Sequence, residues 1–156
     1  MEPNRVLAVA AATGRIGMVF LIGNRLMDWQ ISGKAAKSPE QATRFAASII
    51  HSHHPDVFIT EKIDAARNKG DKAKELVAAM AAIAAEHELL DIAVERPHDF
   101  SNKYAEAAEL TERYPEIAAW KPTRRFFDNE PRNTVLFEAL ALANKILTKP
   151  DAMQQF

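Results

Sequence analysis

The first third of the chain alternates apolar runs with short polar turns. Residues 5–12 form an almost continuous apolar run, which is typical of a strand that is buried on both faces of a sheet. Residues 16–22 are rich in β-branched and aromatic side chains, and residues 25–32 alternate between apolar and polar positions, as a half-exposed edge strand does. Turn signals around Gly14 and Gly23 separate the three runs. The pattern predicts an antiparallel meander of three strands.

The remainder of the chain alternates helical and strand-like segments. Ser38 is a typical start for a helix, because Pro39 follows it directly and Gln41 lies three residues after Ser38. We expect this helix to end near His53. The further elements are predicted as strands over residues 57–60 and 92–94, an alanine-rich helix over about 71–89, and helices over 101–113 and 133–147. This order of elements predicts an α/β fold.

Composition narrows the classes of function. A length of 156 residues predicts a single domain over residues 1–156. The chain has no cysteine, which excludes a thiolate nucleophile, a disulfide framework and a cysteine-based zinc site. The formal net charge of −1 means that any nucleic-acid-binding surface must be a local concentration of basic residues. Arg15 interrupts the N-terminal apolar stretch, and no run reaches the length of about 18 residues that spans a membrane, so we expect a cytoplasmic protein.

Three segments resemble the RuvC-type Holliday-junction resolvases of the RNase H-like superfamily. Residues 7–12, followed by Gly17, resemble the opening strand and turn of that family, and residues 58–62 resemble its fourth strand. Residues 138–143 resemble its closing helix. The resemblance extends over most of the chain and implies an RNase H-like α/β fold. This is a five-stranded mixed sheet, an antiparallel three-strand meander plus two parallel strands, with helices on both faces.

The resemblance implies an incomplete catalytic site. Nucleases of this class use two divalent ions, which carboxylates from several elements hold. The glutamate at the end of the fourth strand matches Glu61, and one acid of the last helix matches Glu138. The aspartate of the first strand falls on Ala10, and the second helical aspartate falls on Val135. Glu61 and Glu138 would then be remnant catalytic and metal-binding residues, and metal-dependent cleavage would be weak or absent.

Two other interpretations of these acids remain open. Asp128 could supply a further metal ligand, with Asp64 and Glu130 as neighbouring candidates, and the chain would then be an active endonuclease that uses Mg²⁺ or Mn²⁺. Alternatively, Glu61 is a solvated residue that follows a strand, and Glu138 is a boundary residue near a helix start, where the helix dipole favours an acid.

Two basic segments are candidates for nucleic-acid binding. The candidate residues are Lys62, Arg67, Lys69 and Lys72 beside Glu61, and Lys121, Arg124, Arg125 and Arg132 around a pair of phenylalanines. Basic residues interleaved with aromatic ones suit a surface that follows the phosphate backbone and stacks on bases, although a solvated loop would show the same pattern. We expect DNA, including four-way junctions, as the partner.

The histidines at positions 51, 53 and 54 and the alanine-rich helix each have two interpretations. The histidines could bind a metal, or they could place positive charge at the end of a helix. The resemblance implies a homodimer through the alanine-rich helix, whereas an ordinary α/β protein would use its apolar face to cover the sheet. The sequence therefore leaves three hypotheses for function: a DNA-binding protein with a degenerate site, an active endonuclease with a rebuilt site, and a protein-interaction module.

Overall fold

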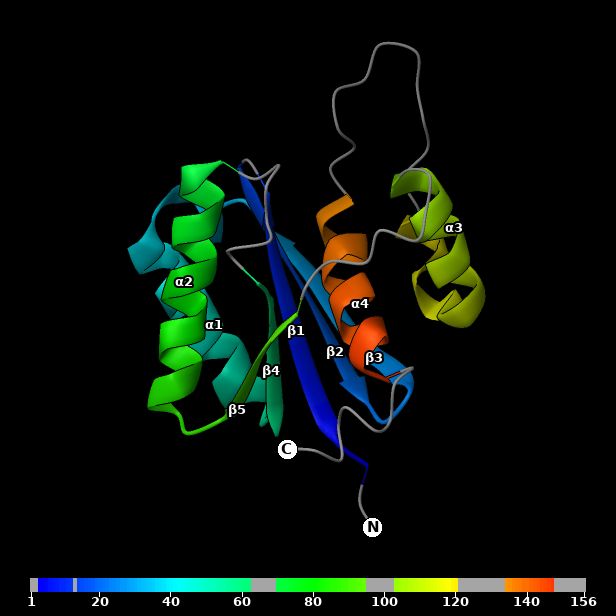
Figure 1. The fold of residues 1–156 in the computed structure, drawn as a ribbon, viewed down its shortest axis with the longest axis horizontal. Helices are drawn as coiled ribbons and strands as arrows, with labels where there is room; N and C mark the ends of the chain where they lie inside the picture. Colours follow the sequence, from blue (N-terminus) through cyan, green and yellow to red (C-terminus); the bar gives the residue numbers. More distant parts are fainter. Residues whose placement is uncertain (1–2, 13, 63–69, 95–102, 121–133, 148–156) are drawn as a thin grey trace.

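A computed structural model describes residues 3–12, 14–62, 70–94, 103–120 and 134–147. Its centre is a mixed sheet of five strands in the order β3-β2-β1-β4-β5 (Figure 1). The strands are β1 (Arg5–Ala12), β2 (Arg15–Ile22), β3 (Arg25–Ser32), β4 (Val57–Glu61) and β5 (Leu90–Val94). The first three pair antiparallel, while β4 pairs parallel with both β1 and β5. The predicted meander and the two parallel strands are confirmed.

Strand β1 lies at the centre of the sheet and separates two hydrophobic cores. Val6, Ala8 and Ala10 face one core, and Leu7, Val9 and Ala11 face the other. Both sets are buried because helices cover both faces, so the strand has no position where a polar side chain would reach water. This explains the continuous apolar run at residues 5–12.

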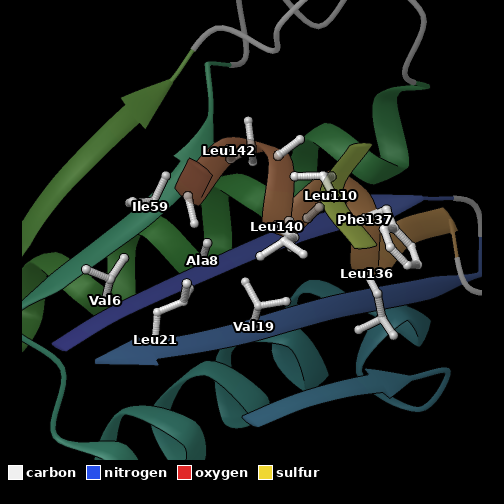
Figure 2. Close-up of a cluster of buried hydrophobic side chains, with 14 of the residues drawn as sticks. Val6, Ala8, Val19, Leu21, Ile59, Leu110, Leu136, Phe137, Leu140 and Leu142 are labelled. Atoms are coloured by element: carbon white, nitrogen blue, oxygen red, sulfur yellow. The ribbon is translucent and has the colours of Figure 1, made fainter. Parts of the chain in front are cut away.

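The helices divide between the two faces of the sheet (Figure 1). On one face, α4 (Thr134–Leu147) packs across β1 and β2, and Leu136 and Leu140 join Val19 in the core that Figure 2 shows. On the other face lie α1 (Pro39–His53) and α2 (Asp71–Glu86). Helix α3 (Lys103–Arg113) and the 3-10 segment η3 (Pro115–Trp120) follow β5, and α3 packs against α4.

A polar contact joins the end of α3 to α4. Arg113 and the hydroxyl of Tyr114 both donate hydrogen bonds to the side-chain oxygen of Asn144, at 2.9 and 3.1 Å. Burial raises the pKa of Tyr114, so its hydroxyl keeps the proton that it donates. The contact therefore fixes the outer helix at one point on the helix that covers the sheet.

Most predicted boundaries agree with the structure to within a few residues. The Ser38 hydroxyl caps α1 by accepting a hydrogen bond from the backbone N–H of Gln41 at 3.1 Å, as the sequence predicts. Strand β4 is one residue longer than predicted and includes Glu61, and β5 begins two residues earlier, at Leu90. Helix α2 ends at Glu86 rather than near residue 89, because Glu88 adopts a positive φ of 57°. The predicted helix start at Ser101 lies outside the described residues.

Arg5 connects the start of β1 to the end of α1. Its Nε donates to the carbonyl oxygen of His54 at 3.0 Å, and its Nη2 donates to that of His53 at 2.6 Å. The backbone N–H of Arg5 donates to a carboxylate oxygen of Asp56 at 3.0 Å. The last carbonyl groups of a helix have no hydrogen-bond donor within the helix. Here the guanidinium group of Arg5 is the donor.

His53 also holds the edge strand β3 against this helix end. Its Nε2 lies 2.8 Å from a carboxylate oxygen of Asp28, and its Nδ1 lies 2.9 Å from the carbonyl oxygen of Ile49. These contacts support the interpretation of the histidines as part of a helix end. Within the described part of the chain, no group of three or more histidines and acids is placed to hold a metal ion. No helix in that part is both long and apolar enough to cross a membrane.

Replacement of Arg5 tests this connection. We expect Arg5→Ala to lower the free energy of unfolding by about 1–3 kcal/mol, because hydrogen bonds from a charged group to two helix-end carbonyls are lost. Urea unfolding measures the change. Arg25→Ala is the control, since Arg25 is an exposed arginine on the neighbouring edge strand, and we expect it to change stability by no more than about 0.5 kcal/mol. Equal stability of the two variants would contradict the role of Arg5.

Candidate functional site

The candidate site lies where β1 and β4 end and β2 begins. Parallel strands end at the same edge of a sheet, so the carboxyl ends of β1 and β4 are neighbours. Ala10 in β1 pairs with Gly17 in β2. Ala8 pairs with Ile59, the last pair of this ladder, and Ala10 and Glu61 each follow two residues later on their strands. Ile59 belongs to the core under α4, so the alternation of side chains along a strand turns Glu61 toward that face as well.

Helix α4 meets this edge at its first turn. A Cβ atom added to Gly17 would lie 2.7 Å from the carbonyl oxygen of Val135 and 3.0 Å from its Cγ1, which is too close for any side chain. The absence of a side chain at position 17 therefore lets the helix backbone rest directly on β2, next to Ala10. Val135 and Glu138 are three residues apart, so they lie on the same side of the helix.

The four residues that the resemblance selects differ in chemistry but are all buried. Ala10 and Val135 are each 1% exposed and belong to one hydrophobic core. Glu61 is 7% exposed and Glu138 is 6% exposed. The interpretation of Glu61 as a solvated residue after a strand is therefore wrong, because it is the buried last residue of β4. Burial of a carboxylate is costly unless partners compensate for the lost water, so two buried glutamates at one edge of a sheet mark the region as a candidate site.

The described residues do not fit a two-metal centre. Two hard cations need carboxylate oxygens from several elements, and of the four positions only Glu61 and Glu138 have a carboxylate. Ala10 and Val135 supply no ligand and pack into apolar surroundings instead. Asp128, Asp64 and Glu130, the acids that could rebuild the site, lie outside the described residues.

Thr134 is a buried polar residue at this edge that the sequence analysis did not select. It is the first residue of α4, and its hydroxyl has no hydrogen-bond partner in the described part of the chain. Such buried unpaired hydroxyls are uncommon in folded proteins. A threonine at a helix start is a recognisable capping signal in the sequence, whereas the burial of its hydroxyl has no local signal.

Two of the predicted nucleic-acid-binding residues lie in the described structure. Lys62 directly follows β4 and is exposed, and its backbone N–H donates to the carbonyl oxygen of Val94 at 2.8 Å. Lys72 is exposed in the first turn of α2, which starts the crossover from the end of β4 to β5. The other six candidates lie outside the described residues: Arg67, Lys69, Lys121, Arg124, Arg125 and Arg132.

The apolar face of α2 packs on the sheet. Leu76, Val77, Met80 and Ala84 are buried in the core between this helix, α1 and the sheet. The interpretation of this face as a cover for the sheet is confirmed. A homodimer through the same helix stays a prediction.

Comparisons with known proteins identify the fold. No protein-family model matches the chain, and a search of curated proteins finds no match. Among solved structures, Thermus thermophilus RuvC superposes with a TM-score of 0.61 and 18% sequence identity, over 97% of this chain and 96% of that chain. The same enzyme in complex with a Holliday junction substrate gives a TM-score of 0.62 at the same identity and coverage.

Two resolvases from other sources give similar results. The yeast mitochondrial Holliday junction resolvase has a TM-score of 0.61 and 11% identity, over 98% of this chain and 82% of that chain. The fowlpox virus Holliday junction resolvase has a TM-score of 0.61 and 11% identity, over 92% of this chain and 98% of that chain. The chain therefore has the RNase H-like fold of the RuvC-type resolvases, as its sequence predicts.

Replacement of Gly17 tests the contact at the candidate site. We expect Gly17→Ala to lower the free energy of unfolding by about 1–3 kcal/mol, because the added methyl group would overlap the backbone of Val135. Thermal or urea unfolding measures the loss. Gly70→Ala is a matched control, since a Cβ atom at Gly70 meets nothing within 4 Å and its φ of −69° suits any residue. Equal effects of the two substitutions would show that α4 does not rest on β2 at this point.

Proposed function

We propose that this protein is a RuvC-like nucleic-acid-binding protein that binds branched or duplex DNA and has little or no metal-dependent endonuclease activity. One observation supports this most strongly. Ala10 and Val135, the positions where the resemblance places two catalytic aspartates, are buried in one apolar core, and both adjoin Gly17, one as its partner in the sheet and the other from α4. They do so in a chain whose fold matches a RuvC nuclease over 97% of its length.

The proposal of DNA as the partner rests on fold and on charge. One of the similar structures was solved in complex with a Holliday junction substrate. In this chain, the exposed Lys62 directly follows Glu61, and the exposed Lys72 lies in the first turn of α2, the next described element after β4. Lysine side chains at such an edge would neutralise phosphates and release counterions, which is the main source of affinity in backbone binding.

The proposal of weak or absent cleavage rests on the ligands that remain. Glu61 and Glu138 are the remnant acids, and they come from one strand and one helix. Two carboxylates can contribute to one cation site, but two-metal cleavage needs about four, distributed around both ions. We therefore expect the edge to have kept the shape of a nuclease site without the charge that would hold both ions.

A junction-binding experiment tests both parts of the proposal. The protein is incubated with a labelled four-way junction and with a duplex of matched sequence, with and without Mg²⁺ or Mn²⁺, and band shift and cleavage are scored together. We expect a shift that weakens steeply as salt rises, and no metal-dependent cleavage above background.

The alternatives predict different outcomes of this experiment. Metal-dependent cleavage that Glu61→Gln abolishes would identify an active endonuclease with a rebuilt site and would overturn the degenerate site. A protein that shifts neither the junction nor the duplex at low salt would leave only the interaction module.

Reintroduction of one carboxylate tests whether the remnant acids can still bind a metal. Ala10 is buried, so we expect Ala10→Asp and Ala10→Asn each to destabilise the fold by several kcal/mol. If Glu61 and Glu138 face the introduced carboxylate, then Mg²⁺ or Mn²⁺ should restore part of the loss in Ala10→Asp alone. The gain would reach about 2.7 kcal/mol when the metal is present at one hundred times its dissociation constant.

Thermal unfolding in chelator and in millimolar metal measures this effect. The Ala10→Asn variant has nearly the same volume without the charge, and it should show no metal effect. A metal-induced rise in the melting temperature of the wild type, equal to that of Ala10→Asp, would show that the natural site binds the ion without a carboxylate at position 10, and this prediction would be wrong.

A further inference from the structure

A second group of basic residues lies at the same end of the sheet, on the side of β2 and β3. Ser32, the last residue of β3, pairs with Ile16 of β2, and the turn that follows β3 approaches the turn between β1 and β2. A Cβ atom on Gly33 would lie 3.7 Å from the carbonyl oxygen of Gly14. The two turns therefore form one corner of the molecule. Its basic residues are Arg15, Lys34 and Lys37, which we call the corner cations.

Hydrogen bonds and buried side chains fix the shape of this corner. The turn contains the 3-10 segment η1 (Ala35–Lys37), in which Ala35 and Ala36 are buried against the core under α1. The N–H of Ala35 donates to the hydroxyl of Ser32 at 3.0 Å. The N–H of Lys37 donates to the carbonyl oxygen of Lys34 at 3.2 Å, so the two lysines are one 3-10 turn apart. Residues three apart in such a turn lie one above the other, and both lysines are exposed.

The corner cations have no ion-pair partner among the residues that the structure describes. Glu40, the acid that follows them in the chain, pairs with Arg44 at 2.9 Å. At the opposite end of the sheet, by contrast, Arg5 is engaged by helix-end carbonyl groups. The positive charge at the corner therefore stays available to an external anion.

The corner borders the candidate site. Arg15 is two residues before Gly17 in β2, a distance of about 7 Å along a strand, and residues two apart share a face of the sheet. Arg15 is thus on the face where Val135 meets Gly17, whereas the segment η1 packs against the opposite face, under α1. The corner therefore lies at the end of the sheet and spans its two faces. Lys62 and Lys72 follow β4 on the other side of the site. The edge that holds Glu61 and Ala10 lies between two groups of positive charge.

We propose that Arg15, Lys34 and Lys37 form a phosphate-binding surface for the backbone of one DNA duplex arm that passes over the end of the sheet, beside the candidate site. This inference rests on the proposed function and adds the surface on which the DNA lies. Lysines act as point charges toward phosphate, and arginine can donate two hydrogen bonds to it. Gly14 and Gly33 are exposed and have no side chain to keep a phosphate backbone away from the turns. Such contacts orient DNA without reading its sequence.

The test compares two variants that change the net charge equally. Lys34→Ala/Lys37→Ala removes two positive charges from the corner, and Arg25→Glu lowers the charge by the same two units at the opposite end of β3. Fluorescence anisotropy gives the affinity for a four-way junction and for a duplex at several salt concentrations. Loss of two phosphate contacts should reduce the slope of log affinity against log salt by about 1.8. Between 50 and 200 mM salt, this corresponds to roughly tenfold less salt sensitivity. We expect Arg25→Glu to leave the slope unchanged.

A measurement on the unmodified protein makes the test independent of folding in the variants. Acetylation of lysines followed by mass spectrometry should show Lys34 and Lys37 protected by the junction, while Lys145, near the other end of α4, keeps its reactivity. If the wild type binds DNA but neither the salt slope nor the protection involves the corner, this inference is overturned and the proposed function stands. If the wild type does not bind DNA at all, both are overturned.

Discussion

The arrangement of the site depends on the contact between the first turn of α4 and β2 at Gly17. The helix backbone can come this close only because position 17 has no side chain, and the contact determines where the helix starts relative to the sheet. The positions of the α4 residues at the site follow from that contact: Val135 joins the core that contains Ala10, Glu138 lies one turn further along the buried side of the helix, and Thr134 is enclosed at the helix start. A bulkier residue in β2 would lift the helix and move Glu138 away from the sheet edge at which Glu61 ends β4.

The same geometry has different energetic consequences in an active two-metal enzyme and in this chain. Carboxylates grouped at a buried edge repel one another and lose water, so their charge must be balanced by cations or by protonation. Alanine and valine at positions 10 and 135 remove both penalties and add apolar contacts. Under the proposed function, apolar packing at this edge thus replaces the charged groups of a catalytic site. The neighbouring lysines and arginine would act on DNA through phosphate neutralisation alone.

The sequence predicts those parts of the structure that local patterns determine. The apolar run of β1, the alternation in β3 and the Ser38 cap all depend on neighbouring residues, and each is confirmed. Burial of Glu61 could not be predicted in this way, because α4, which completes the core on that face of the sheet, comes from the far end of the chain. The bonds from Arg5 to the end of α1 join segments about 50 residues apart and leave no periodic signal. No local pattern joins Lys34 and Lys37 to Arg15, because they lie on different turns, which approach each other where Gly33 lies near Gly14.

The covering of the sheet by α4 has a consequence for how the chain is made. The core between α4 and the sheet contains residues of β1, which is synthesised first among the described elements. It also contains residues of α4, which is synthesised last among them. Until α4 emerges, Val6, Ala8 and Val19 have no helix to cover them, so a nascent or truncated chain presents an apolar sheet face to the solvent. The candidate site and the protection of that face therefore arise in the same step, late in synthesis, when the last helix docks on the meander.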